Sequence, residues 1–565
     1  MQDSFFLDNI NKLFSKKKYN DVIIKIENNN QFLENYPDLF NICGVSKILK
    51  SDNNKSDIIS ALQDFENYFL NSKVDNKKIE AVCNYIATCV VNSKKYEDII
   101  SYFSKAKKIF ELCKKQIGYN EKLFISGVDL YKYLVDLYSA KQLLKELIKK
   151  KSKSKIVYSA FGYLNNYDYE WNLKEYFEYS KKIIDFFPQH RSEIVNKINY
   201  KENKKIKIGF ISKDFKANHS LTYFLKSFLL YFDKNKFETY GITLTDDNFI
   251  KDSSLELKNN FENWLNLSKL NNQEIINVLQ NHKIEILVDL LGLFHADRIE
   301  IFNSRISPLQ VSWLGYPNTV GFSNIDYLIS DKNLIKDGEE KFYSEKILKL
   351  SEIWNCHSGF EFDRKLLETP VKLNKYITFG SFNNFLKISN EVLEVWSEIL
   401  KKTKNSKLIL KSSLNVNNNI IYEKFKKFGV HNSIKIYESS NFKDIKDHIN
   451  LYKKIDIALD TFPYNGVTTT FEALWSGVPV ISMKGYNMNS RCGESILKNG
   501  KIGSLISENK KDYITKALYY SKNIDKLEKL RLKIFNNILN SPLFDSKKFS
   551  IEYQNKLLSV YNRTI

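Results

Sequence analysis

Three threonines follow a glycine turn at the point where a helix is expected to begin. In the segment Asp460–Pro479, Gly466 is followed after one residue by Thr468, Thr469 and Thr470. The first turn of a helix has unpaired backbone N–H groups and the positive end of the helix dipole, and hydroxyl groups add further donors. This pattern predicts a phosphate site that needs no metal ion. The alternative is that one threonine caps the helix, but three β-branched residues are more than a cap requires.

An acidic residue shares a face with the first of these threonines. Glu472 lies four residues beyond Thr468, which is about one helical turn. A carboxylate in this position could accept hydrogen bonds from ribose hydroxyls, as acidic residues do in dinucleotide sites. Together, the threonine run and this acid predict a site for a nucleoside diphosphate.

Two α/β units are expected to position this turn. Short apolar runs predict strands, and amphipathic segments between them predict helices, an alternation typical of parallel sheets. The expected strands lie at Lys205–Ser212, Phe237–Leu244, Lys283–Leu290, Leu309–Gly315, Ile325–Ser330 and Glu345–Leu350, and then at Tyr376–Phe382, Ser406–Ser412, Ser433–Ser439, Lys454–Asp460 and Val478–Met483. The segment Ser358–Lys375 reads as a linker between the units. Ligands of such sheets bind at the carboxyl ends of the strands, so a cleft between the units is expected.

Residues 1–200 have a different pattern, with apolar residues at helical spacing and few turn signals. Asp21, Asp57 and Asp98 recur in similar contexts at intervals of 36 and 41 residues. A tetratricopeptide repeat has a period of about 34 residues. The spacing therefore predicts a degenerate helical-repeat domain, and an irregular helical domain is the alternative.

The composition is that of a globular protein. Of the 565 residues, 43% are hydrophobic, and no apolar run is long enough for a membrane span. The beginning of the sequence does not resemble a signal peptide, which predicts a cytoplasmic protein. The net charge of +20 accompanies a general excess of lysine without a basic stripe interleaved with aromatic residues, so nucleic-acid binding is not expected. The six cysteines form no CxxC pair, and a metal site is not expected either.

Several long motifs follow one another along residues 204–561. In order, they are KIKIGFISKDFKANHSLTYFL, RISPLQVSWLGYPNTVGFSNIDYLISD, TFGSFNNFLKISNEVLEVWSEIL, DTFPYNGVTTTFEALWSGVPV followed by SR, and NSPLFDSKKFSIEY. With these motifs, the region resembles the catalytic region of protein O-GlcNAc transferases and their SPINDLY-like relatives. The resemblance implies an α/β GT-B fold, in which two Rossmann-like domains face a cleft. The acceptor-side domain would span residues 204–365 and the donor domain, with closing helices, residues 370–565. An all-α, tetratricopeptide-like domain would precede them at residues 1–200.

The resemblance also implies roles for residues on the donor side. Lys387 matches a lysine that contacts the diphosphate and would stabilise the departing nucleotide. Asn384 matches an amide-bearing donor contact, and His448 matches a histidine that lies against the base. Without the family, Lys387 and His448 would read as surface residues.

On the acceptor side, the resemblance implies two candidates for the general base. His219 matches a family histidine, and an imidazole can take a hydroxyl proton near neutral pH. Asp289 is the second candidate, and a capping role at the end of its strand is the alternative. Tyr316 and Pro317 lie in a loop expected to shape the sugar and acceptor pocket. His295 is displaced from the position where relatives have a histidine, and no catalytic role is assigned to it.

The family implies an inverting, metal-independent glycosyltransferase without a cofactor. The expected donor is UDP-GlcNAc, and the expected acceptors are serine or threonine residues of proteins bound through the N-terminal helices. Val467 replaces the histidine of animal O-GlcNAc transferases and moves the site toward the SPINDLY-like pattern, whose plant members use a fucosyl donor. The sequence also leaves open an N-glucosyltransferase of related fold and an inactive helical-repeat scaffold.

Overall fold

The computed structural model describes residues 2–93, 95–169, 171–184, 205–216, 219–246, 256–366, 368–412, 418–439, 442 and 444–564. These residues form two compact units, one made of residues 1–152 and 412–421 and the other of residues 153–411 and 422–565. Among the residues that the structure describes, no helix is long and apolar enough to cross a membrane.

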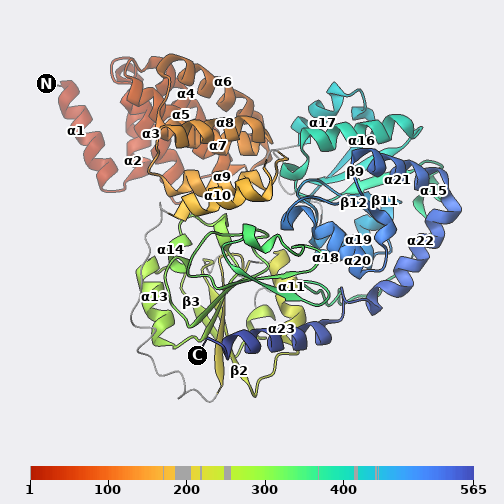
Figure 1. Ribbon diagram of the computed structural model, residues 1–565. Coiled ribbons are helices and arrows are strands. Elements are labelled where there is room, and N and C mark those ends of the chain that lie inside the picture. The colour runs from red at the N-terminus through yellow and green to blue at the C-terminus, as the bar shows by residue number, and fades with distance from the viewer. Residues whose placement is uncertain are drawn as a thin grey trace. The chain divides into compact units, whose positions relative to one another are not determined.

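The first unit is built from helices (Figure 1). Residues 2–149 form α1 (Gln2–Ser15), α2 (Tyr19–Glu27), α3 (Asp38–Leu49), α4 (Lys55–Asn71), α5 (Asp75–Asn92), α6 (Tyr102–Ile117), α7 (Glu121–Tyr133) and α8 (Leu137–Lys149). Consecutive helices pack together, above all α3 with α4, α4 with α5, and α7 with α8. The predicted all-α helical-repeat region is confirmed.

Two of the three repeat segments open an α-helix. The Asn54 side chain accepts a hydrogen bond from the Asp57 backbone N–H, and the Asp57 carboxylate accepts one from the Asn54 N–H. This reciprocal cap begins α4. The third segment instead contains a 3₁₀ turn at Glu97–Ser101, so its local structure departs from that of the other two.

Two helices that precede the strands belong to the second unit by their packing. They are α9 (Lys155–Asn165) and α10 (Leu173–Ile184). The Ser159 hydroxyl of α9 donates a hydrogen bond to the carbonyl oxygen of Leu293 in the first α/β half. The two compact units therefore divide at residue 152. The predicted domain boundary near residue 200 stays a prediction, because residues 185–204 lie outside the described part.

The second unit contains two sheets. The first has the order β3-β2-β1-β4-β5-β6-β7, and all its neighbouring strands are parallel. Its strands are β1 (Ile206–Ser212), β2 (Phe237–Thr243), β3 (Asn263–Asn266), β4 (Ile286–Asp289), β5 (Leu309–Ser312), β6 (Tyr327–Asp331) and β7 (Lys346–Leu350). Connecting helices include α11 (Ser220–Leu229), α13 (Asn272–Asn281) and α14 (Ile299–Phe302). The central strands β4 and β5 are fully buried because a parallel sheet is covered on both faces.

The second sheet has the order β10-β9-β8-β11-β12-β13. Its strands are β8 (Thr378–Ser381), β9 (Lys407–Ser412), β10 (Ile434–Glu438), β11 (Ile457–Leu459), β12 (Val480–Met483) and β13 (Ile506–Ser507). The helices of this part of the sequence are α15 (Pro370–Asn374), α16 (Asn390–Lys402), α17 (Asn418–Lys427), α18 (Ile445–Leu451), α19 (Thr468–Trp475), α20 (Cys492–Asn499), α21 (Lys510–Lys522) and α22 (Ile524–Asn537). The division between the two compact units falls within α17, after Ile421. The predicted tandem of α/β halves is confirmed.

The last helix returns to the first half. Helix α23 (Ser546–Tyr561) lies beside α11, as Figure 1 shows. The Ser550 hydroxyl donates a hydrogen bond of 2.9 Å to the carbonyl oxygen of Phe228. The Tyr553 ring lies 5.1 Å from the Phe228 ring and 4.7 Å from the Trp313 ring. The core of the first half therefore includes side chains of the last helix in the sequence.

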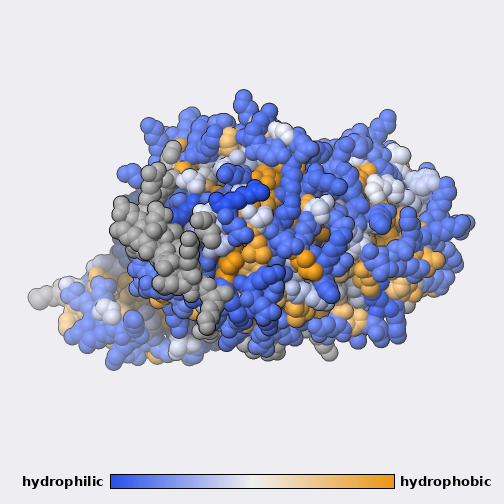
Figure 2. Space-filling view, turned by 60° about the horizontal axis from the view of Figure 1, so that its bottom comes forward, coloured by the Kyte–Doolittle hydropathy of each residue, from blue (hydrophilic) through white to orange (hydrophobic). Residues whose placement is uncertain are grey.

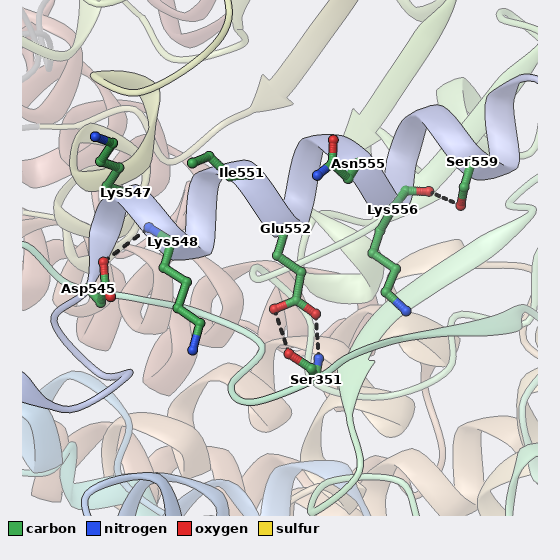
Figure 3. A pocket seen from close by; sticks show the side chains of 9 residues that line it. All are labelled: Ser351, Asp545, Lys547, Lys548, Ile551, Glu552, Asn555, Lys556 and Ser559. Atoms are coloured by element: carbon green, nitrogen blue, oxygen red, sulfur yellow. Dashed lines mark hydrogen bonds between the residues drawn. The ribbon is translucent and has the colours of Figure 1, made fainter.

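The outer side of α23 borders an open pocket (Figure 3). The pocket is lined by Ser351, Asp545, Lys547, Lys548, Ile551, Glu552, Asn555, Lys556 and Ser559. None of the residues predicted for the active site is among them. The face drawn in Figure 2 is mostly hydrophilic, and its hydrophobic residues form small separate groups, which fits the charged composition.

Candidate active site

The loop between β11 and α19 ends in the threonine run. Helix α19 begins at Thr468, and its N-cap residue, Val467, makes no capping hydrogen bond with its side chain. The Thr470 hydroxyl donates to the carbonyl oxygen of Gly466 at 3.1 Å, and the Thr469 hydroxyl donates to the Asn383 side chain at 3.1 Å. The Thr468 hydroxyl has no partner among the described residues. The helix start therefore keeps unpaired donors, and Thr468 is the threonine that could add its hydroxyl to them.

Gly466 is required by the packing of the loop itself. A Cβ atom at this position would lie 2.4 Å from the Thr469 hydroxyl oxygen and 2.8 Å from the Asn383 side-chain oxygen. The Gly466 backbone N–H donates to Asp460 at 2.7 Å. Burial raises the pKa of Asp460 to about 6, although its hydrogen bonds oppose this shift. The absence of a side chain at Gly466 therefore lets Asp460 and Asn383 hold the loop together.

Lys387 reaches the same loop from the 3₁₀ turn Phe385–Lys387. Its ammonium donates a hydrogen bond of 2.8 Å to the carbonyl oxygen of Asn465 and lies 4.0 Å from the centre of the Tyr464 ring. Burial lowers the pKa of Lys387 to about 8, while Asp460 opposes the shift. A cation that is partly shielded from water in this way gains more from a bound anion than a fully exposed one does. Lys387 and the start of α19 therefore meet at one place.

Asn384 begins the turn that carries Lys387. Its side-chain oxygen accepts a hydrogen bond of 3.0 Å from the Leu386 N–H, and the residue is exposed. The side-chain NH₂ group has no partner among the described residues. Asn384 therefore positions the turn and leaves a donor beside the lysine.

Glu472 and His448 form a buried network. The His448 Nε2 atom lies 3.0 Å from Glu472 Oε2, and the Tyr452 hydroxyl donates to the same oxygen at 2.8 Å. On the other side of the ring, the Lys411 ammonium lies 3.0 Å from His448 Nδ1. Since an ammonium can only donate, Nδ1 accepts and Nε2 carries the proton given to Glu472.

This network holds Glu472 as a carboxylate. Burial favours its neutral form, but His448, together with Tyr452 and Lys411, outweighs this and lowers the pKa of Glu472 below its usual value. Oε2 is committed to His448 and Tyr452, so Oε1 is the oxygen that could accept a ribose hydroxyl. The predicted neighbours Thr468 and Glu472 do lie on the same short helix.

The acceptor-side candidates lie at the carboxyl ends of β1 and β4. His219 is the N-cap of α11, and its Nδ1 atom accepts a hydrogen bond of 3.3 Å from the Leu221 N–H. Burial lowers the pKa of His219, against the influence of Asp214. The imidazole is therefore neutral near pH 7.

Asp289 is buried beneath the loop that follows β4. Its carboxylate accepts hydrogen bonds from the N–H groups of Leu291 and Gly292, at 2.7 and 3.1 Å. Burial raises the pKa of Asp289 to about 6, although these donors oppose the shift. Its carboxylate thus caps the loop after the strand, which is the arrangement expected if the residue has no catalytic role.

Tyr316 is fully packed. It is 1% exposed, and its hydroxyl bonds to the Tyr176 hydroxyl and accepts a 3.0 Å hydrogen bond from Asn166. Pro317, the next residue, is partly exposed. The loop is thus anchored by Tyr316, and Pro317 is the residue of the pair that remains accessible.

Asn166 is a residue that sequence reasoning missed. Besides its bond to Tyr316, its side-chain oxygen accepts from Asn318 at 3.0 Å, and its backbone oxygen accepts from Asn489 at 2.7 Å. It therefore ties together loops from both α/β halves. The only signal was an unusual run of asparagine and tyrosine at residues 163–169, which has no helical pattern of its own.

In the described chain, no group of three or more His, Cys, Asp or Glu residues could hold a metal ion.

Two parallel α/β sheets, with the candidate groups gathered at the ends of their strands, define a two-domain glycosyltransferase fold of GT-B type. The structure of a Thermobaculum terrenum O-GlcNAc transferase mutant matches with a TM-score of 0.77 at 20% identity, covering 90% of this chain and 95% of that one. At this identity the match shows the fold. It confirms the predicted α/β GT-B architecture with its N-terminal helices.

The sequence comparisons place the chain in a family. The family model described as "Glycosyl transferase family 41" matches residues 186–360 and 363–553, and the chain belongs to this family. A rice protein described as "Probable UDP-N-acetylglucosamine--peptide N-acetylglucosaminyltransferase SPINDLY" is 29% identical over 392 residues, which are 68% of this chain and 42% of the rice protein. An Arabidopsis thaliana protein of the same description, named SEC, is 28% identical over 373 residues, 64% of this chain and 37% of its own length.

The chain spans about two-fifths of the length of these curated relatives. The resemblance to O-GlcNAc transferases and SPINDLY-like proteins is confirmed, and so is the expectation of a glycosyltransferase at the level of the family.

Proposed function

We propose that this protein transfers a sugar from a nucleoside diphosphate to serine or threonine hydroxyls of acceptor proteins. The transfer inverts the anomeric carbon and needs neither a metal ion nor a cofactor. One observation carries the proposal: the ammonium of Lys387 and the open start of α19 meet at Asn465 and Gly466, at the carboxyl edge of the second sheet. A cation and a helix start at one place suit a diphosphate.

The residues on the donor side would both bind the nucleotide sugar and activate its leaving group. Lys387, Thr468 and the first N–H groups of α19 hold the diphosphate, and they stabilise the negative charge that grows on it as the bond to the sugar breaks. The Lys411–His448–Glu472 network presents the imidazole and Glu472 Oε1 to the nucleoside. Since these groups are fixed before the ligand arrives, little reorganisation is needed during the reaction.

The donor is proposed to be UDP-GlcNAc, because the names of the plant relatives specify this sugar nucleotide. A fucosyl donor of SPINDLY type is the main alternative, since Val467 supplies no side-chain hydrogen bond at the start of α19. The acceptor is proposed to enter through the N-terminal helices. A cytoplasmic location also stays a prediction.

The proposal is tested by ligand binding followed by transfer. Purified protein with EDTA is heated with UDP, GDP, UDP-GlcNAc, UDP-Glc or GDP-fucose, and the melting temperatures of wild type and Lys387→Ala are compared. Stabilisation by one nucleotide family, lost in the variant, is expected. Mass spectrometry of peptides incubated with the stabilising donor then identifies the sugar and the modified residue.

Each contrary outcome has a defined meaning. Modified asparagine would favour an N-glucosyltransferase over transfer to hydroxyls. Binding without any turnover would favour a scaffold that has lost activity. The absence of stabilisation by every nucleotide would contradict the donor site itself.

A further inference from the structure

We propose that His295, oriented by Asp214, is the residue that takes the proton from the acceptor hydroxyl. This inference rests on the proposed transferase function and names a base that differs from both sequence candidates.

The two side chains form an acid–imidazole pair at the carboxyl edge of the first sheet. Asp214 follows β1, and His295 follows the 3₁₀ turn Gly292–Phe294 beyond β4. The His295 Nε2 atom lies 3.2 Å from Asp214 Oδ2. Both side chains are about one-fifth exposed, at 20% and 18%, so the pair is sheltered but open on one side.

Asp214 decides which ring nitrogen carries the proton. Burial favours a neutral carboxyl group, but the hydrogen bond with His295 and the nearby His219 lower the pKa of Asp214 well below its usual range. The carboxylate can only accept, so His295 Nε2 donates to it. In the neutral ring Nδ1 then has a free lone pair, and it has no partner among the described residues. This is the arrangement in which a carboxylate prepares an imidazole to act as a base.

The other two candidates lack such an atom. Nδ1 of His219 accepts from the Leu221 N–H, so its neutral ring carries a proton on Nε2 and presents a donor. The Asp289 carboxylate is 1% exposed and is bound by the N–H groups of the loop above it. Of the three, His295 alone offers an uncommitted acceptor.

An aromatic wall connects His295 with the donor site. The ring of Phe294, its neighbour in sequence, lies 5.0 Å from the Tyr163 ring, which lies 5.2 Å from the Tyr167 ring. Tyr167 in turn lies 5.0 Å from Tyr464, whose ring is 4.0 Å from the Lys387 ammonium. These rings form a continuous row from Lys387, past Tyr163 of α9, to Phe294, the residue directly before His295.

Two lysines near the pair bind carboxylate oxygens other than Oδ2 of Asp214. Lys216 binds the other oxygen of Asp214 at 2.8 Å, and Lys213 binds Asp297 at 2.6 Å. His219 also lowers the pKa of Asp214, and His295 in turn acts on the carboxyl groups of Asp289 and Asp297. Because Lys216 occupies Oδ1 alone, Oδ2 stays available to orient His295.

The reaction balances with these groups. The acceptor oxygen forms a bond to the anomeric carbon while the bond from that carbon to the diphosphate oxygen breaks, and the electron pair leaves with the nucleoside diphosphate. The hydroxyl proton moves to His295 Nδ1 and gives an imidazolium that Asp214 stabilises. Loss of this proton to water restores the base.

The test compares His295→Gln, Asp214→Asn and His219→Asn with His282→Gln, a control on the same α/β half. Transfer is measured on a library of serine- and threonine-containing peptides, with whichever of UDP-GlcNAc, UDP-Glc and GDP-fucose the wild type uses. A general base contributes about 10²–10⁴-fold. His295→Gln is therefore expected to lose at least about a hundredfold in kcat, with its thermal shift by UDP or GDP unchanged.

Two readouts separate catalysis from a structural role. Added imidazole is expected to restore part of the activity of His295→Ala, and the fall in wild-type activity at acidic pH is expected to disappear in His295→Gln. Asp214→Asn is expected to lower kcat while leaving nucleotide binding intact, and His219→Asn, which can keep the helix cap, is expected to stay within about tenfold of wild type.

The outcomes are distinguishable. An active wild type whose His295→Gln variant keeps its kcat within about twofold overturns this inference alone, as does loss of activity in His219→Asn alone. A wild type that transfers nothing from any donor overturns the proposed function, and this inference falls with it.

Discussion

The ammonium of Lys387 donates a hydrogen bond of 2.8 Å to the carbonyl oxygen of Asn465, the residue directly before Gly466. This contact joins two features that the sequence presents separately, 78 residues apart. One is a lysine with a pKa lowered by burial, and the other is the beginning of α19 with its free donors. An anion bound between them would interact with both the ammonium and the helix start.

Nucleotide binding should depend on pH through Lys387. Burial lowers its pKa from 10.5 to about 8, so in the free protein the ammonium is lost as the pH rises above about 8. A diphosphate needs the charged form, and the affinity for UDP or GDP should fall by up to about tenfold per pH unit above that value. Titration calorimetry at several pH values checks this. Lys387→Arg remains charged, so its affinity should show no such fall, and an unchanged wild-type affinity up to about pH 10 would argue against the role.

The three threonines should differ when each is changed to alanine. Thr468→Ala removes the hydroxyl that has no partner among the described residues and should weaken nucleotide binding by about tenfold or more, the cost of one hydrogen bond to a charged group. Thr470→Ala removes the bond to Gly466 and should lower the melting temperature instead. Isothermal titration and thermal melting separate the two effects. Thr468→Ser, which keeps the hydroxyl, is the control and should bind as wild type does.

Glu472 should stabilise the folded protein at neutral pH and not in acid. His448 lowers its pKa in the folded state below the ordinary 4.5, so its contribution is present above that value and is lost as the pH falls through the lowered pKa. Glu472→Gln should cost about 1.5–3 kcal/mol at neutral pH. Urea unfolding at neutral pH and at about pH 4 measures the difference, which should shrink at the lower pH. Glu398→Gln changes an exposed pair with Lys402 and serves as the control.

Arg491 should hold the two α/β halves together. It is 5% exposed, pairs with Glu339 of the first half through both of its terminal nitrogens, and also donates to the carbonyl oxygen of Leu334. Arg491→Met leaves Glu339 without its partner and should cost about 3 kcal/mol in urea unfolding. Lys402→Met breaks an exposed ion pair and should cost less than about 1 kcal/mol. Equal effects of the two changes would show that the buried pair contributes little.

Much of the fold could be predicted because its strands are short apolar runs between turns. Every strand expected from the sequence is present, including β1 and β11. The unexpected strands are β3, whose four residues are polar or only partly buried, and β13, which has two residues. Neither is long enough to show a hydrophobic pattern in the sequence. Both are strands because they pair with a neighbouring strand.

The candidate site was predictable where the chemistry is local. The threonine run and Glu472 belong to one helix, so their spacing shows that they share a face. Asn166 bonds to a residue 150 positions away, and His295 pairs with one 81 positions away. Spacing along the chain carries no information about such contacts. The pairing of His295 with Asp214 thus depends on β1 and β4 being neighbours in the sheet.

The return of α23 to the first half has a consequence for synthesis on the ribosome. Phe228 and Trp313 complete their packing against Phe549 and Tyr553, which are translated more than 200 residues later. The second half can form its sheet while Phe228 and Trp313 of the first half still lack these aromatic partners. Newly made chains would thus expose this aromatic surface until the last helix emerges, and this is the interval in which a chaperone could hold them.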